Sequence, residues 1–393
     1  MASPRLPLSA RRRMLLATAG ATLLATAAAA PAGAASLPGV AGPPAFTLTP
    51  QGGKTGILRD LGKRLPRASV GAVLASANRA TGPVGGALSP RPAGFQNGFR
   101  FNRGDDGTSK WFPQGISGTG DATPSGLVDG RRALLVSWYA RNPVTKSGTV
   151  APGVRVTFAT AEKLAASRYR HVLLVVPKRV GGRASFTWTP SHAGGIAWVG
   201  NRLYVAETNG GLSVYGTRRI WRVKTGDKAR IGCDAGACQA ADYQYVMPKV
   251  AAYRNNTSGL RFSSVAYDRA SNNLVTGEYR KADEGNARIV RWPLNANGTL
   301  QAIGPKGKRL VRASGVWVAQ GVPKIQGVLT IGTTAYLSTS GDGHGLYVGP
   351  LGGALAKRTW PTGAEDLTYA PASGRIYSLT EPEGRRAVFG VSR

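Results

Sequence analysis

The sequence repeats a pattern of short strands, and this repetition limits the possible folds more than any other feature. Each repeat has a small or polar start, an apolar run, a short turn, a second run ending in Thr, Ser, Glu or Tyr, and a third run. The repeats begin at Gln114, Gly194, Ser263, Gln326 and Glu365. Runs of roughly four to eight residues rich in Val, Tyr, Trp and Thr, divided by Gly, Asn and Asp, are typical of β-strands. The chain is therefore predicted to be an all-β repeat protein.

The number of strands favours a ring of repeats. Four repeats offer a fourth strand, at residues 169–177, 243–253, 308–318 and 354–361, but the last repeat has three strands before the chain ends. Residues 95–102 ("FQNGFRFN") are predicted to supply its fourth strand. Closure of this kind protects the edges of the sheets. We predict a β-propeller of five four-stranded blades with the N-terminal strand closing the last blade. The alternatives are six blades or a two-sheet sandwich.

The first part of the chain divides into two segments of different composition. Residues 1–35 contain a basic stretch, a run rich in Leu and Ala, and a small-residue cleavage site near Ala32–Ala34, which predicts an export signal and an extracellular location. Arg12–Arg13 before "MLL" favours a twin-arginine signal, with an ordinary secretory signal as the alternative. No transmembrane segment is predicted in the mature chain.

Residues 36–93 are rich in Pro, Gly and Ala and contain few aromatic residues. This composition predicts a flexible linker. Aromatic residues become frequent from Phe95 onward, so the β-propeller domain is expected to span residues 94–393.

The chain is strongly basic, with 51 Lys and Arg against 19 Asp and Glu and a net charge of +32. This charge favours anionic partners such as cell-envelope polymers. The basic residues form no long run and no nucleic-acid-binding motif is present, so nucleic acid is not expected as a specific partner. The protein is expected to be a monomer.

The two cysteines, Cys233 and Cys238, lie in "GCDAGACQ". An exported protein meets an oxidising environment, so a local disulfide is predicted. Two cysteines alone cannot complete a zinc site.

Several phrases resemble a group of uncharacterised secreted actinobacterial propeller-like proteins: "WFPQGIS", "HAGGIAW", "LYVAET", "VTGEYR", "RWPL", "EDLTY" and "SLTE…GRR". The resemblance covers roughly residues 95–393. It implies a propeller fold and export, and it implies no particular activity.

Propeller geometry predicts where polar residues gather. The start of the first strand and the end of the second strand of each blade lie on one face, around the mouth of the central channel. The candidate ligand-binding residues at these positions, or directly beside them, are Gln114, His192, Glu207, Glu278, Gln326, His344, Glu365 and Glu381. Their clustering in so basic a chain predicts either a ligand site or carboxylates that tether neighbouring blades.

The glutamates suggest a possible cation site. Oxygen ligands suit Ca²⁺, so Glu207, Glu278, Glu365 and Glu381 are candidate calcium ligands, and no other cofactor is expected. His192, Glu207 and Glu365 are the candidate catalytic residues, with His192 as a general base.

Known catalytic motifs are missing from the sequence. It has no G-x-S-x-G, H-E-x-x-H or P-loop motif. The strand starts also lack the separated carboxylates of five-bladed glycosidases and the carboxylate–Asn–Asp metal set of gluconolactonase-like propellers. Trp111 and Trp138 are predicted either to stack on sugar rings or to pack between blades.

Three functions remain open. The first is an exported propeller that binds carbohydrate or an anionic envelope component at the channel mouth. The second is a metal-assisted hydrolase or lyase acting on an extracellular saccharide or lactone. The third is a protein–protein scaffold.

Overall fold

The computed structural model describes residues 35–42, 45–140, 153–341 and 343–393, and most of these residues form or connect β-strands. The all-β class is therefore confirmed. The predicted export signal lies, except for Ala35, outside the described residues. In the described part of the chain, no helix is long and apolar enough to cross a membrane.

Three separate sheets each contain four antiparallel strands. The first sheet consists of β17 (Ser264–Asp268), β18 (Asn273–Gly277), β19 (Ala287–Pro293) and β22 (Gly315–Ala319). The second consists of β23 (Ile325–Ile331), β24 (Thr334–Thr339), β25 (Leu346–Pro350) and β26 (Ala356–Arg358). The third consists of β27 (Ala364–Ala370), β28 (Arg375–Thr380), β29 (Ala387–Ser392) and β4 (Phe95–Arg100). The pairing of β4 with β29 agrees with the strand predicted at residues 95–102.

The remaining repeats belong to one larger sheet. One half of its path consists of β5 (Trp111–Gly118), β6 (Ala133–Ala140), β7 (Val154–Thr160) and β8 (Arg168–Val180). The other half consists of β10 (Ile196–Val199), β11 (Arg202–Glu207), β12 (Gly211–Gly216) and β16 (Tyr245–Asn255). Each half is antiparallel, and the two halves join where β16 pairs with β8 in parallel. The expected four-stranded units are therefore present, with two of them hydrogen-bonded along their outer strands.

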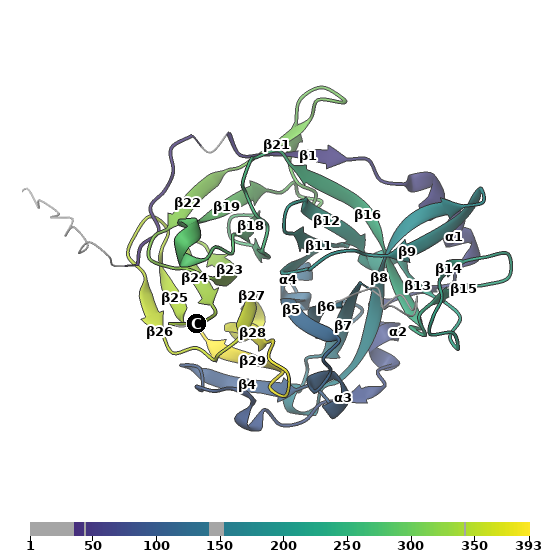
Figure 1. Cartoon of the computed structure of the whole chain (residues 1–393), viewed down its shortest axis with the longest axis horizontal. Coiled ribbons are helices and arrows are strands. Elements are labelled where there is room, and N and C mark those ends of the chain that lie inside the picture. Colours follow the sequence, from purple (N-terminus) through teal and green to yellow (C-terminus); the bar gives the residue numbers. More distant parts are fainter. Residues whose placement is uncertain (1–34, 43–44, 141–152, 342) are drawn as a thin grey trace, which may run out of the picture. The chain divides into compact units, whose positions relative to one another are not determined.

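The first strands of the five units contact one another in a cycle. β5 contacts β10, β10 contacts β17, β17 contacts β23, β23 contacts β27, and β27 contacts β5 (Figure 1). A two-sheet sandwich does not describe this arrangement. The fold is a propeller-like assembly of small sheets.

Apolar side chains fill the spaces between successive units. One cluster joins β7 and β8 to β10 and β11, and others join β12 to β17, β18 to β24, β25 to β27, and β29 to β6. Both faces of a strand such as β12 are therefore buried. Burial on two faces explains why the strands read as nearly continuous apolar runs.

Two equivalent hairpins depend on glycine. Gly200 connects β10 to β11 with φ +54°, and Gly332 connects β23 to β24 with φ +63°. Each stands first in a two-residue turn, where a positive φ matches the twist of the strands and favours glycine. Glycine in the short turn between the first two strands of a repeat therefore has a conformational reason.

The prediction of a flexible linker at residues 36–93 is wrong. This segment, which we call the N-terminal belt, contains α1 (Thr55–Arg64), α2 (Val70–Ala75), the strands β1 (Thr47–Gln51), β2 (Arg67–Ala68) and β3 (Arg79–Ala80), and the short helix η2 (Gly85–Ala87). Leucines of α1 pack with residues of β8 and β9 in a separate apolar cluster. The spacing of Leu58, Leu61 and Leu65 gives the helix one apolar face, which the composition argument overlooked.

The belt follows the outer strands of the sheets (Figure 1). Leu37 donates its backbone N–H to Gly353 near β26, β1 pairs with β16, and β3 pairs with β8. The belt ends with the N–H of Ala93 donated to Thr359, again near β26. It thus begins and ends beside the same sheet after contacting the others.

The other described elements connect or cover these sheets. They are α3 (Arg103–Asp106), α4 (Thr119–Ala122), η3 (Leu164–Ala166), β9 (Arg183–Trp188), η4 (Thr217–Arg219), β13 (Ile220–Arg222), β14 (Ile231–Cys233), β15 (Cys238–Ala240), η5 (Ala282–Glu284), β20 (Ala302–Ile303), β21 (Leu310–Arg312) and η6 (Pro371–Ser373). The helix α4 contacts β5, β10 and β27, so it lies against the innermost strands. Cys233 and Cys238 pair across β14 and β15 as the predicted disulfide, with an S–S length of 2.02 Å.

Candidate functional site

Four of the predicted residues meet in two amide–carboxylate pairs. Gln114 Nε2 donates to Glu381 Oε1 at 2.9 Å, and Gln326 Nε2 donates to Glu365 Oε1 at 3.3 Å. Each pair joins two neighbouring units, β5 to the end of β28 and β23 to β27. These contacts favour the prediction that the carboxylates tether neighbouring blades, because each glutamine amide donates its hydrogen bond to a glutamate of the next unit.

Glu365 is fully enclosed beside these contacts. Burial raises its pKa well above the ordinary value, and the negative charges of Glu381 and Asp366 raise it further. The neutral acid is therefore the favoured form in the fold. Its Oε1 already accepts the hydrogen bond from Gln326.

Asp366, the residue after Glu365 in β27, contacts two other innermost strands. Its Oδ2 accepts hydrogen bonds from the backbone N–H of Ile116 at 3.1 Å and of Ile196 at 3.2 Å. Burial raises the pKa of Asp366 well above the ordinary value, and the two N–H donors oppose that rise. One carboxylate thus accepts backbone hydrogen bonds from two innermost strands.

Small residues make room for this carboxylate. Gly115, Gly195 and Gly327 occupy the position of Asp366 in three of the other four repeats, directly after the predicted strand start, and Ser264 occupies it in the fourth. A Cβ on Gly115 would lie 2.8 Å from the nitrogen of Ile196, and one on Gly327 would lie 2.7 Å from the Cα of Asp366. At these three glycines the innermost strands therefore approach too closely for a side chain.

His192 and Glu207 line a common cavity of about 810 Å³, which we call the His192 cavity. It opens between the ends of β9 and β11 and the middle of β16. Its walls are formed by Gln51, Val176, Thr187, Trp188, Thr189, Pro190, Ser191, His192, Glu207, Thr208, Asn209, Gly210, Leu212, Ser213, Lys249, Ala252 and Arg254. The sequence therefore identified two of the polar residues in this cavity. It missed Trp188 and Lys249, because neither lies at a strand start or at the end of a second strand.

The imidazole of His192 is exposed to solvent at the edge of the cavity. Its ring lies 4.3 Å from the ring of Tyr139, measured between centroids. Partial desolvation lowers the pKa of His192 below 6.5, so the ring is mainly uncharged at neutral pH. A neutral imidazole can accept a proton or a hydrogen bond from a ligand.

Glu207 and Lys249 provide opposite charges in the same cavity. Burial lowers the pKa of Lys249, and the negative charge of Glu207 opposes that change. Behind them, Ser213 is fully buried, and its Oγ has no hydrogen-bond partner among the described residues. The cavity wall thus includes the hydroxyl of Ser213, which has no hydrogen-bond partner among the described residues, as well as a hydrogen-bond donor in Lys249 and an acceptor in Glu207.

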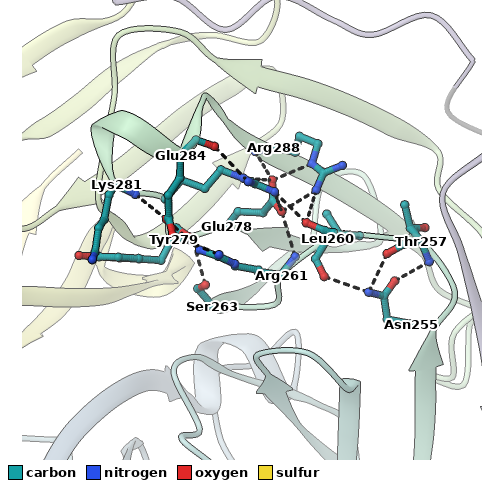
Figure 2. A network of polar contacts seen from close by, with 12 residues as sticks. Asn255, Thr257, Leu260, Arg261, Ser263, Glu278, Tyr279, Lys281, Glu284 and Arg288 are labelled. Atoms are coloured by element: carbon teal, nitrogen blue, oxygen red, sulfur yellow. Dashed lines mark hydrogen bonds and ion pairs between the residues drawn. The ribbon is translucent and has the colours of Figure 1, made fainter.

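Glu278 has a structural role (Figure 2). Its carboxylate pairs with Arg280 at 2.9 Å and Arg288 at 2.7 Å and also accepts the N–H of Arg261 at 2.9 Å. Burial alone would raise its pKa, but hydrogen bonds from the two guanidinium groups outweigh burial and lower it. The same arginines donate to the carbonyl of Gly259, so Glu278 anchors the loop before β17 and has no oxygen left for a ligand.

His344 lies apart from the His192 cavity. Its Nδ1 lies 3.1 Å from the carbonyl oxygen of Gly341, and its Nε2 lies 3.4 Å from the Thr362 hydroxyl. These local contacts hold the turn between β24 and β25. The prediction that His344 shares one ligand site with His192 is therefore wrong.

The predicted calcium site does not form as a group of four glutamates. Within residues 35–42, 45–140, 153–341 and 343–393, no three His, Cys, Asp or Glu side chains are placed to hold a metal ion. Glu278 is occupied by arginines, and Glu207 lies in the His192 cavity while Glu365 and Glu381 join the amide pairs. The residues present do not fit a resident calcium ion.

Comparison with known proteins gives matches among solved structures alone. No protein-family model matches the chain, and no curated protein matches it at a significant level. Among solved structures, the chain is similar to a gluconolactonase from Xanthomonas campestris, with 14% identity, a TM-score of 0.35, and coverage of 80% of this chain and 98% of that one. It is also similar to hydrazine synthase from Kuenenia stuttgartiensis, with 12% identity, a TM-score of 0.31, and coverage of 73% and 97%. Neither similarity is high enough to carry a conclusion about this protein.

Proposed function

We propose that the protein is an exported five-bladed β-propeller that binds a carbohydrate in the His192 cavity. The blade number is supported by the five four-stranded units and by the cycle of contacts among β5, β10, β17, β23 and β27. Blade closure is supported by the pairing of β4 with β29. Membership in the secreted actinobacterial group that the sequence resembles is part of the same proposal.

The observation that carries the proposal is the composition of the cavity wall. Trp188 supplies a flat apolar surface, and the partly exposed or exposed side chains of Gln51, Thr187 and Asn209 supply donors and acceptors around it. The unpartnered hydroxyl of Ser213 lies in the same wall. A sugar ring presents an apolar face and a rim of hydroxyl groups, so this wall matches it in both respects.

The size of the cavity agrees with this ligand class. A volume of about 810 Å³ is within the range of roughly 300–1,000 Å³ that small-molecule sites occupy. Glu207 offsets one of the two cations in the wall, Lys249 and Arg254, so the cavity carries little net charge and suits a ligand bound mainly by its hydroxyl groups.

Calorimetric titration of the mature chain with neutral oligosaccharides tests the proposal. Binding is expected to persist at 0.5 M salt, where attraction by net charge is screened. Trp188→Ala is expected to weaken binding at least about tenfold, or about 1.4 kcal/mol, while Trp188→Phe keeps most of it because the ring is retained. Binding that is equal in the Ala and Phe variants, or that disappears in salt, would refute the proposal.

A second candidate is a hydrolase or lyase acting on a saccharide or lactone in the same cavity. It is favoured by the neutral imidazole of His192, which shares the cavity with Glu207 and Lys249 and could accept a proton from water or substrate. Turnover of a bound oligosaccharide or lactone, abolished by His192→Gln with binding retained, would support an enzyme. Binding without turnover would leave a binding protein.

A scaffold for other proteins is the third candidate. It predicts that substitutions at Trp188 and His192 leave function unchanged, because outer surfaces would carry the interaction. No feature of the described surface favours this candidate over the cavity.

Export is proposed on the sequence of residues 1–35, and the Cys233–Cys238 disulfide is consistent with an oxidising compartment. N-terminal sequencing of the protein recovered from the culture medium tests it. A mature N-terminus near residue 35 is expected, and Arg12→Lys together with Arg13→Lys blocks export if the signal is of the twin-arginine type.

A further inference from the structure

A second cavity is lined by residues of β3, β5 and β8 and has a different chemical character from the His192 cavity. It has a volume of about 380 Å³ and shares no lining residue with the His192 cavity. Its walls are formed by Asn78, Arg79, Trp111, Arg170, His171, Lys228, Ala241, Asp242, Tyr243 and Gln244. We call it the Arg170 cavity.

Three cations from separate segments meet in this cavity. Arg79 comes from β3, Arg170 from β8, and Lys228 from the loop after β13. The packing of the N-terminal belt against β8 therefore creates part of the site, since β3 belongs to the belt.

The positive charge in the cavity is only partly neutralised. Arg79 pairs with Asp105 at 3.2 Å, and the one carboxylate in the wall, Asp242, accepts the N–H of Gly226 at 2.8 Å. Arg170 donates to the carbonyl of Ser76 at 2.7 Å. In the part of the chain that the structure describes, neither Arg170 nor Lys228 has a carboxylate within ion-pair distance.

Arg170 is also surrounded by like charges. Its pKa is lowered by burial, and the positive charges of Arg79 and Arg222 add to this effect. Arg170 and Arg222 both lie against the ring of Tyr245, at 5.5 and 5.8 Å from its centroid. A guanidinium group that lines a cavity and has no carboxylate partner can bind a phosphate or carboxylate through two hydrogen bonds.

One wall of the cavity is aromatic. The rings of Trp111 and Tyr243 meet edge to face, with centroids 6.5 Å apart. Arg155 stacks against the Trp111 ring at 4.5 Å from its centroid, which holds the indole in place. The amides of Asn78 and Gln244 lie in the same wall and can bond to hydroxyl groups.

We propose that the Arg170 cavity binds an anionic sugar, with its phosphate or carboxylate group held by Arg170 and Lys228 and its ring resting against Trp111. The site is separate from the one described under the proposed function and does not depend on it. Binding at this site would use part of the chain's large positive charge in a direct contact with an anion, in addition to long-range attraction.

Calorimetric titration of the mature chain tests this site. The probes are glucose 6-phosphate and glucuronic acid, with glucose and inorganic phosphate as the neutral and ringless controls. At least one of the two anionic sugars is expected to bind at least tenfold more tightly than either control. The stronger of the two identifies whether phosphate or carboxylate is preferred.

Substitutions then locate the binding. Arg170→Gln and Lys228→Gln are each expected to weaken it at least tenfold, whereas Arg183→Gln, an exposed arginine outside the cavity, leaves it unchanged. Lys228 is exposed on a loop, so its variant folds even if the Arg170 variant does not. Trp188→Ala should not affect this binding, which separates it from the His192 cavity.

Three results would overturn the proposal. The first is no binding of either anionic sugar to the wild-type protein. The second is equal binding of inorganic phosphate, which would leave the aromatic wall without a role. The third is an equal loss in Lys228→Gln and Arg183→Gln, which would assign the effect to total charge.

Discussion

At the scale of single residues, buried carboxylates differ because their partners differ. Glu278 faces Arg280 and Arg288, and hydrogen bonds from them lower its pKa despite burial. Asp121 of α4 accepts hydrogen bonds from the hydroxyl groups of Ser117 at 2.7 Å and Thr368 at 2.6 Å, and burial raises its pKa despite these bonds. The pKa values of two buried acids thus shift in opposite directions.

Asp121 gives a prediction about pH. Burial raises its pKa from 3.8 to about 6, so folding favours the neutral acid. The stability that this provides is complete below pH 3.8 and is lost as the pH rises through 6. Asp121→Asn keeps a neutral side chain, so the stability of the wild type relative to this variant is expected to fall by roughly 2 kcal/mol between pH 4 and pH 7.5.

Urea unfolding at a series of pH values measures this difference. Asp283→Asn, which changes an exposed acid, serves as the control and is expected to track the wild type. If the curves for wild type and Asp121→Asn ran parallel from pH 4 to pH 7.5, Asp121 would not be the group responsible.

At the scale of elements, the innermost strands depend on close backbone approach. β10 follows Gly194 and Gly195, and a Cβ at Gly195 would collide with the backbone of Ser264 and Val265 in the neighbouring unit. The repeated small residue at the strand start is thus a packing requirement, and it also leaves the space that Asp366 fills.

Gly195→Ala is expected to destabilise the protein by about 3 kcal/mol or more, because the collision involves backbone atoms that cannot rotate away. Thermal unfolding followed by circular dichroism measures the loss. Gly52→Ala is the matched control, since Gly52 has an ordinary φ and no atom within 4 Å of an added Cβ. An equal effect of both changes would mean that close approach at Gly195 is not the cause.

The strands themselves could be predicted from the sequence, whereas the belt helices could not. The apolar runs at β10, β17 and β23 are bounded by clear turn residues, so local pattern is sufficient. Leu58 and Leu61 of α1, with Leu65 at its C-cap, form an apolar face, but the Pro and Gly around them are typical of a flexible segment. Composition is a weak guide where a short segment folds onto a surface that other residues provide.

At the scale of the whole molecule, the belt connects sheets that are distant in sequence. It buries Leu37 and Leu48 as well as leucines of α1. A chain without these residues would expose apolar surface along the outer strands of several units. The belt is therefore part of the folded domain.

A variant that begins at residue 94, the domain start expected from the sequence, is predicted to aggregate or to lose cooperative unfolding. A variant that begins at residue 35 is predicted to fold like the mature protein. Size-exclusion chromatography and thermal unfolding compare the two. A soluble, cooperatively folding chain from residue 94 would show that the belt is dispensable.

Some contacts between the candidate site residues could be predicted from the position of each residue in its repeat. The pairing of Gln114 with Glu381 and of Gln326 with Glu365 follows from placing strand starts and strand ends on one face. Glu278 occupies an equivalent position, yet its carboxylate is used by arginines from its own unit. Position in the repeat therefore located these side chains without revealing which of them remain available to a ligand.

The strands, their grouping in fours, the disulfide and the residues near the strand starts could all be predicted, because each depends on local pattern or on repetition. The folded chain was needed to show that Trp188 and Lys249 complete the His192 cavity, that Arg79 joins Arg170, and that Asp366 lies between the innermost strands. These outcomes depend on the packing of segments far apart in the chain. Burial and charge at such contacts are set by neighbours that no local pattern specifies.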